Sequence, residues 1–224
     1  MPPRSIKKFN RENAKMERII QKWEKLQDTP LNLKSRLVIF ISVIFLLAVF
    51  FFPLWRMQFF ATFYPDGLKL YIYSYKLEGG KTAGRDDLRE INTLNHYIGM
   101  KPLSQSDFAE FTYLPFVFGA LGLLALRAVV LGKISTLVDL IVMYLYVGIF
   151  SILDFYNKLY TYGHNLAPDA PIKVQPFTPP LLGKKLIAQF TVYSYPDLGS
   201  IGLLLSLLTL VVALILTSKE VKTE

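Results

Sequence analysis

The stretch that decides the fold is Leu37-Val-Ile-Phe-Ile-Ser-Val-Ile-Phe-Leu-Leu-Ala-Val-Phe-Phe-Phe-Pro-Leu-Trp55, which contains no charged side chain. About twenty apolar residues in a helix cross the roughly 30 Å hydrocarbon core of a bilayer. Arg36 and Arg56 flank the run, and Trp55 suits the membrane–water interface. The sequence therefore predicts a membrane-spanning helix over 37–55, ended or bent by Pro53.

The chain of 224 residues contains three further apolar runs of this kind, at 113–131, 136–155 and 198–217. Because the apolar residues gather in these runs instead of spreading along the chain, the runs are predicted to lie in a lipid bilayer. We expect a membrane all-α protein with four transmembrane helices. A small α/β cap, built from two outward-facing insertions at 56–112 and 156–197, would complete the fold, with a short tail at 218–224.

The charge pattern predicts the orientation of these helices. Of the net charge of +8, most lies in residues 1–36, which hold ten basic and four acidic side chains. The turn at 132–135 and the tail are also basic, whereas the insertion 56–112 balances seven basic against seven acidic residues. By the positive-inside rule both termini are predicted to be cytoplasmic, and both insertions face outward, which in a bacterial inner membrane means the periplasm.

The N-terminal segment 5–26 has the pattern of an amphipathic helix. Its apolar positions recur at roughly helical spacing among charged residues: Phe9, Met16, Ile19, Ile20, Trp23 and Leu26. Such a helix can lie in the cytoplasmic interface of the membrane or dock against a partner subunit. A nucleic-acid role is the other interpretation of a basic arm. Attraction to anionic lipid explains the charge without it, so no nucleic-acid partner is predicted.

Each insertion contains a predicted strand. In 56–112 the alternation at 68–77 favours a strand, and Asp86 or Asp87 is a candidate N-cap for a helix that ends at Gly99. In 156–197 a dense run of prolines excludes a helix, and the apolar stretch 185–195 favours a second strand. These two strands could pair into a small sheet above the helices.

The candidate site residues are His96, Met100 and His164. The chain has no cysteine, which excludes disulfides and thiolate ligands, and these are its only two histidines. A helix reaching through Gly99 would place His96 and Met100 on one face, and imidazole with thioether is a ligand pair suited to Cu(I). The alternative is structural: each histidine bonds a loop backbone and Met100 fills a gap.

Asp154 is a further candidate, either as a carboxylate ligand or proton-relay group or as an ordinary interfacial residue. The motifs of common catalytic sites are missing: the sequence shows no glycine-rich phosphate loop, no HExxH and no G-x-S-x-G. We therefore expect no enzymatic activity.

Several segments together resemble a family of small, largely uncharacterised bacterial membrane proteins associated with nitrous oxide reductase maturation. The resemblance covers about 50–200 and lies in FPLW at 52–55, YPDGL at 64–68, INTLNHYIGMK at 91–101, DFY at 154–156, YGHNLAPDAPIK at 162–173 and PPLLG at 179–183. One departure is Val174-Gln175-Pro176-Phe177, where a methionine is expected in the proline loop.

The resemblance implies an accessory protein that supports assembly of, or copper or electron supply to, a periplasmic copper enzyme such as nitrous oxide reductase. His96, Met100 and His164 would then form a shared periplasmic Cu(I) site. Its partners would be the bilayer, a periplasmic copper protein or chaperone and subunits of a membrane complex. Two other functions are considered: a non-catalytic scaffold subunit, and a quinol- or haem-linked electron-transfer subunit, for which the sequence offers few ligands.

Overall fold

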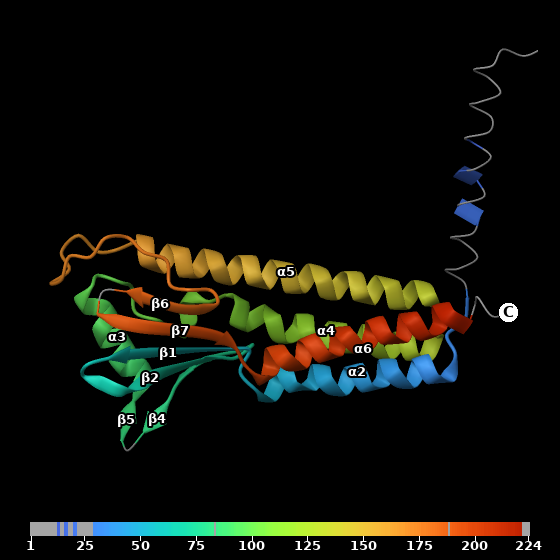
Figure 1. Ribbon diagram of the computed structural model, residues 1–224, viewed down its shortest axis with the longest axis horizontal. Coiled ribbons are helices and arrows are strands. Elements are labelled where there is room, and N and C mark those ends of the chain that lie inside the picture. Colours follow the sequence, from blue (N-terminus) through green and yellow to red (C-terminus); the bar gives the residue numbers. More distant parts are fainter. Residues whose placement is uncertain are drawn as a thin grey trace, which may run out of the picture.

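The computed structural model describes residues 29–82, 84–187 and 189–220, with Asn13, Met16, Glu17, Ile20 and Gln21. Apart from those five residues, the predicted amphipathic helix over 5–26 lies outside the described part, as do 221–224. Two regions follow one another along the long axis (Figure 1): a bundle of four long helices, and a domain built around a β-sheet. We call the second region the sheet domain; it is formed by 52–109 and 165–197.

The bundle consists of α2 (Leu33–Phe51), α4 (Glu110–Leu131), α5 (Ile134–His164) and α6 (Leu198–Glu220). All four are long and apolar enough to cross a membrane. The prediction of four such helices is confirmed, although α2 begins and ends earlier than the predicted span at 37–55.

Pro53 ends α2. Proline disfavours helical backbone in the residue before it, and Phe52 is accordingly extended, with φ −118° and ψ 151°. The chain leaves the helix there and enters a strand at Trp55. Trp55 is therefore the first residue of a strand and not the last residue of the predicted helix.

The sheet domain contains a five-stranded antiparallel sheet with the order β3-β2-β1-β7-β6. Its strands are β1 (Trp55–Ala61), β2 (Tyr64–Ile72), β3 (Leu77–Gly79), β6 (Gly183–Ile187) and β7 (Phe190–Pro196). A short hairpin of β4 (Lys81–Thr82) and β5 (Arg85–Asp86) precedes α3 (Asp87–Tyr97), and a 3₁₀ turn, η1 (Gln105–Asp107), precedes α4.

The predicted membrane all-α class is wrong, because this sheet is a major element and not a minor cap. Sequence reasoning missed β1, since it assigned Trp55 to the end of the membrane-spanning helix and the residues after it to the insertion. The predicted strands at 68–77 and 185–195 do not pair with each other. Met57 of β1 lies between them, opposite Leu70 of β2 on one side and Ser194 of β7 on the other.

One face of the sheet is covered by α3. Met57, Leu70 and Val192 are buried and form one cluster with Ile91 of α3. Of the two predicted N-cap residues, Asp86 and Asp87, the structure selects Asp86, whose side chain accepts from the backbone N–H of Leu88 at 3.0 Å.

Within the bundle, α2 and α6 pack through small residues. A Cβ atom added to Gly202 would lie 2.6 Å from the Cβ of Ala48, so the two backbones approach too closely for a larger residue. Hydroxyl groups join the same helices: Ser206 donates to the carbonyl of Ser42 at 2.8 Å, and Ser35 donates to the carbonyl of Ala213 at 3.1 Å.

The longest helix is α5, with 31 residues. At ~1.5 Å per residue it measures ~46 Å, which exceeds the ~30 Å of a hydrocarbon core. Figure 1 shows its C-terminal part continuing beside the sheet domain. His164 is consequently the last residue of a helix, and not part of the loop in which it was predicted.

Candidate functional site

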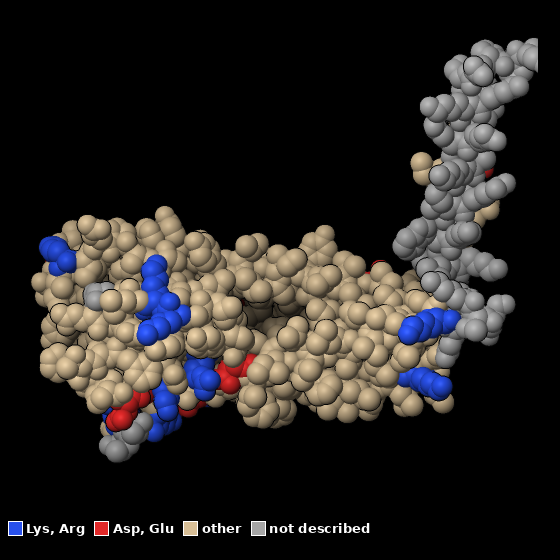
Figure 2. Space-filling view, viewed as in Figure 1, with Lys and Arg blue, Asp and Glu red and all other residues tan. Residues whose placement is uncertain are grey.

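A cavity of about 560 Å³ lies where the sheet domain meets the bundle. The sheet contributes Met57, Leu70 and Val192 to its wall, α4 contributes Phe111, and α6 contributes Leu203. Figure 2 shows the surface hollowed at this junction, between the two regions of the molecule. The cavity therefore extends from the face of the sheet that carries Met57 into the helical bundle.

The cavity exists because the middle of α5 stands away from its neighbours. Tyr144 and Leu159 are buried, but in the fully described stretch between them α5 has no buried residue. Gly148 lines the cavity, and no described atom outside its own helical surroundings lies within 4 Å of a Cβ built on it. Apolar side chains of this stretch are open to the outside, including Ile149, which is 59% exposed. In a membrane this gap would face lipid.

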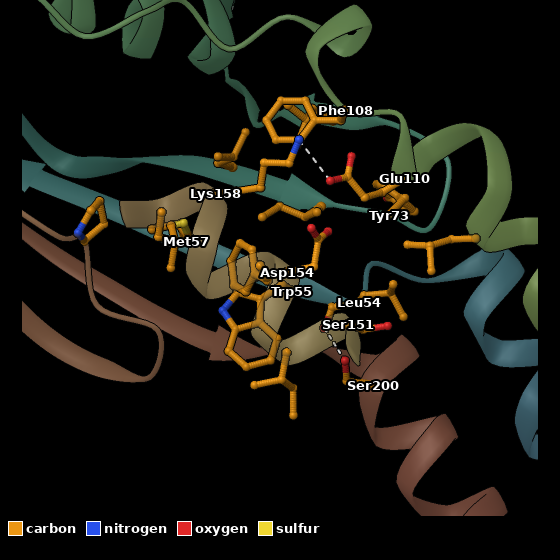
Figure 3. Close-up of a pocket in the computed structure, with 18 of the residues that line it drawn as sticks. Leu54, Trp55, Met57, Tyr73, Phe108, Glu110, Ser151, Asp154, Lys158 and Ser200 are labelled. Atoms are coloured by element: carbon orange, nitrogen blue, oxygen red, sulfur yellow. Dashed lines mark hydrogen bonds and ion pairs between the residues drawn. The ribbon is translucent and has the colours of Figure 1, made fainter. Parts of the chain in front are cut away.

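Three charged residues form a cluster on the wall (Figure 3), namely Glu110, Asp154 and Lys158. The ammonium nitrogen of Lys158 lies 2.9 Å from Oε1 of Glu110, which joins α5 to the first turn of α4. It also donates to the carbonyl of Asp107 at 3.2 Å and lies 5.4 Å from the ring centre of Phe108. Asp154, one helical turn before Lys158, points toward the same space in Figure 3.

Unsatisfied polar atoms mark the same cavity. Among the described residues, the buried side-chain atoms without a hydrogen-bond partner are Nδ2 of Asn95, Oε2 of Glu110 and Oγ of Ser151. All three residues line the cavity. A buried polar atom without a partner costs about 1–3 kcal/mol, and native proteins contain few of them. The amide is a donor, the carboxylate oxygen an acceptor and the hydroxyl either, so the cavity wall offers both kinds of hydrogen-bonding atom.

Aromatic rings make up much of the remaining wall near the charged cluster. The ring of Trp55 meets that of Phe155 edge-on, with centres 5.4 Å apart, and its indole N–H donates to Ser194 at 2.8 Å. Tyr73, between β2 and β3, also faces the cavity, and burial followed by the nearby Glu78 raises the pKa of its hydroxyl. Tyr73 therefore stays a neutral hydrogen-bonding group at physiological pH.

The first two predicted copper ligands, His96 and Met100, lie on either side of the end of α3. α3 ends at Tyr97, and Gly99 takes the left-handed conformation, φ 77°, that closes the helix. Met100 follows this turn, with its backbone N–H donating to the carbonyl of Asn95 at 2.8 Å. Because the helix does not reach through Gly99, the four-residue spacing does not place the two side chains on one helical face. Met100 lines the cavity, whereas His96 is exposed and is not among the lining residues.

His164 makes local contacts at the end of α5. Its Nδ1 lies 2.9 Å from the carbonyl oxygen of Tyr160, and its ring stacks on that of Tyr160 with centres 3.8 Å apart. The segments that carry the two histidines do meet: the backbone N–H of Ala167 donates to Gly99 at 2.8 Å, and that of Ile172 donates to Tyr97 at 2.9 Å. In the part of the chain that the structure describes, no group of three or more His, Cys, Asp or Glu side chains could hold a metal ion.

Sequence reasoning singled out Asp154 but missed Asn95, Glu110, Ser151 and Lys158. The signals were present but weak: Asp154 and Lys158 are four residues apart at the end of an apolar run, and Glu110 stands just before another. Their convergence depends on how α4 and α5 pack, which no local pattern encodes.

Comparison with known proteins finds no matching family model, no matching curated protein and no matching solved structure.

Proposed function

We propose that this chain is a multi-pass membrane protein that binds a membrane-soluble amphiphile, with the apolar part in the cavity and the polar head at the charged cluster. The supporting observation is the coincidence of an apolar cavity with all three unsatisfied buried polar atoms among the described residues. Ligand sites are typically apolar concavities with a few convergent polar groups. The gap along the middle of α5 would let such a molecule enter from the bilayer.

The test uses Trp55 as a reporter. The chain has two tryptophans, so Trp23→Phe leaves only the one on the cavity wall. We expect a brominated long-chain fatty alcohol to quench Trp55 fluorescence saturably in this background. Gly148→Leu, which places a bulky side chain on the cavity wall, should weaken the saturable part. Gly119→Leu is the matched control, since Gly119 is also a helical glycine with open space around it but does not line the cavity. Equal saturable quenching in the Trp23→Phe protein and in its Gly148→Leu and Gly119→Leu derivatives would contradict the proposal.

The orientation is also a proposal: the sheet domain lies in the periplasm and both termini lie in the cytoplasm of a bacterial inner membrane. The structure supports one part of the reasoning, since the α4–α5 turn and the chain before α2 meet at the same end of the bundle. There the backbone N–H of Leu31 donates to the carbonyl of Gly132 at 2.6 Å. Lys34 and Arg36 at the start of α2 and Lys133 in the turn therefore lie at the same end of the bundle, which supports assigning that end to the cytoplasm.

Because the chain has no cysteine, single cysteines can test this orientation. Lys184 on β6 and Lys34 at the start of α2 are both exposed. We expect a membrane-impermeant thiol reagent to label Lys184→Cys but not Lys34→Cys in spheroplasts. The reverse pattern would place the sheet domain in the cytoplasm.

Copper handling near His96, Met100 and His164 is a second candidate function, in keeping with the resemblance to proteins of nitrous oxide reductase maturation. It is supported by the backbone hydrogen bonds that join Gly99 to Ala167, since they bring the two histidine-bearing segments together. Titration of the purified protein with Cu(I) tests it. The expected result is weaker binding by His96→Ala and by His164→Ala than by the unchanged protein. Equal affinity in all three would exclude the site and leave the scaffold function as the alternative.

A further inference from the structure

We infer that the head group bound in this cavity is an uncharged ring bearing hydroxyl or carbonyl oxygens, which is the chemistry of membrane quinols and quinones. This inference rests on the proposed amphiphile-binding function and narrows it to one ligand class. Charge, hydrogen bonding and the shape of the walls each support it.

The charge balance disfavours an anionic head group. Among the described lining residues the charged ones are Glu110, Asp154 and Lys158, two acids against one base. An ammonium group has three donors, and that of Lys158 already contacts Glu110, the carbonyl of Asp107 and the face of the Phe108 ring. A phosphate placed here would meet two carboxyl groups without an available cation. A cationic head would compete with Lys158 for Glu110, leaving an uncharged head as the better fit.

The unsatisfied atoms match the oxygens of a quinol or quinone. A carbonyl or hydroxyl oxygen can accept from Nδ2 of Asn95 on α3 or from Oγ of Ser151 on α5. A quinone or quinol ring carries two such oxygens.

The walls suit a flat ring and a long tail. Trp55 and Phe155 present aromatic surfaces from the sheet and from α5, and aromatic rings attract one another in offset or edge-on arrangements. The deeper lining is aliphatic, including Leu121 of α4 and Leu207 of α6. Together with the gap beside Gly148, this provides an apolar path along which an isoprenoid chain could extend toward lipid.

The experiment repeats the Trp55 quenching assay with named ligands. Decylubiquinone and its reduced quinol are compared with dioctanoylglycerol, a neutral lipid without a ring, with short-chain phosphatidylglycerol, which is anionic, and with dodecylamine, which is cationic. The three non-quenching lipids are measured by their competition with the brominated alcohol. We expect the quinone or quinol to bind saturably and more tightly than the other three. Ser151→Ala should weaken this binding about fivefold, the effect of losing one hydrogen bond.

The outcomes separate the two proposals. If dioctanoylglycerol, phosphatidylglycerol or dodecylamine displaces the brominated alcohol while the quinone and quinol do not, the amphiphile cavity stands and the quinone assignment is overturned. If the Ser151→Ala variant binds decylubiquinol as tightly as the unchanged protein does, the head group is not hydrogen-bonded to Ser151 and the inference fails. If no ligand binds saturably and Gly148→Leu behaves like Gly119→Leu, both proposals fail.

Discussion

The ammonium nitrogen of Lys158 lies 2.9 Å from Oε1 of Glu110, and this ion pair joins α5 to the start of α4 at the rim of the cavity. The two side chains are 28% and 12% exposed, so the pair is partly screened by solvent. Elsewhere along the cavity α5 is held by few buried residues, and the pair therefore contributes to its position.

Removing one partner should be more harmful than removing both. We expect Lys158→Met to lower the free energy of unfolding by about 1–3 kcal/mol, because it leaves a mostly buried carboxylate without a cation. The double variant Glu110→Gln, Lys158→Met should recover part of this loss. Thermal unfolding in detergent measures these two proteins and the single variant Glu110→Gln. A double variant with the summed loss of the two single variants would show that the side chains are not coupled.

Ser151→Ala should raise Tm slightly in protein stripped of ligand. The hydroxyl of Ser151 is buried without a partner, so its removal relieves a desolvation penalty of about 1 kcal/mol or more. Ser206→Ala is the matched control, because that hydroxyl lies 2.8 Å from the hydroxyl of Tyr144 and donates to the carbonyl of Ser42. We expect the control to lose stability. A similar loss in Ser151→Ala would mean that its hydroxyl has a structural partner.

Substitutions of the bundle glycines should have opposite signs. Gly202→Ala would push a Cβ to 2.6 Å from that of Ala48, so we expect α2 and α6 to separate and the protein to lose about 1–3 kcal/mol. Gly148→Ala meets open space, and alanine favours a helix over glycine by about 0.5–1 kcal/mol. Denaturation in mild detergent compares the two. Equal effects would indicate that α2 and α6 do not pack as described.

In the sheet domain Asp87 should matter more than its neighbour Asp86. The Asp87 side chain is 1% exposed, accepts from the backbone N–H of Lys69 at 3.0 Å and binds Nε of Arg85 at 2.8 Å. Asp87→Ala leaves those donors unpaired and should cost about 2–4 kcal/mol. Asp86→Ala removes a solvent-exposed helix cap, at about 1 kcal/mol. Protease sensitivity of the α3 region in the folded protein ranks the two variants, and the reverse order would contradict this account.

The sequence predicted the four long helices because each contains an apolar run that only a bilayer-sized helix explains. It predicted the N-cap of α3 because an aspartate before a helical pattern is a local signal. It did not predict β1, because Trp55 suits the interfacial end of a membrane helix as well as the first position of a strand.

The site was harder to predict than the helices. His96 and Met100 attract notice as rare residues at a regular spacing, yet the spacing depends on a helix that Gly99 ends. Ser151 attracts no notice, since a serine in a membrane helix is common. Ser151 becomes a candidate only in the folded protein, where its hydroxyl is buried at the cavity without a hydrogen-bond partner.

The central position of β1 also has a consequence for how the protein is made. β1 pairs with β2 from the first insertion and with β7, which ends at Pro196, close to the end of the chain. During synthesis β1 must therefore keep one edge unpaired until three helices have been inserted and the second insertion has emerged. An unpaired strand edge is prone to wrong pairing. We expect the sheet domain to complete its folding only after α2, α4 and α5 have been inserted, and to be the part most dependent on chaperones during biogenesis.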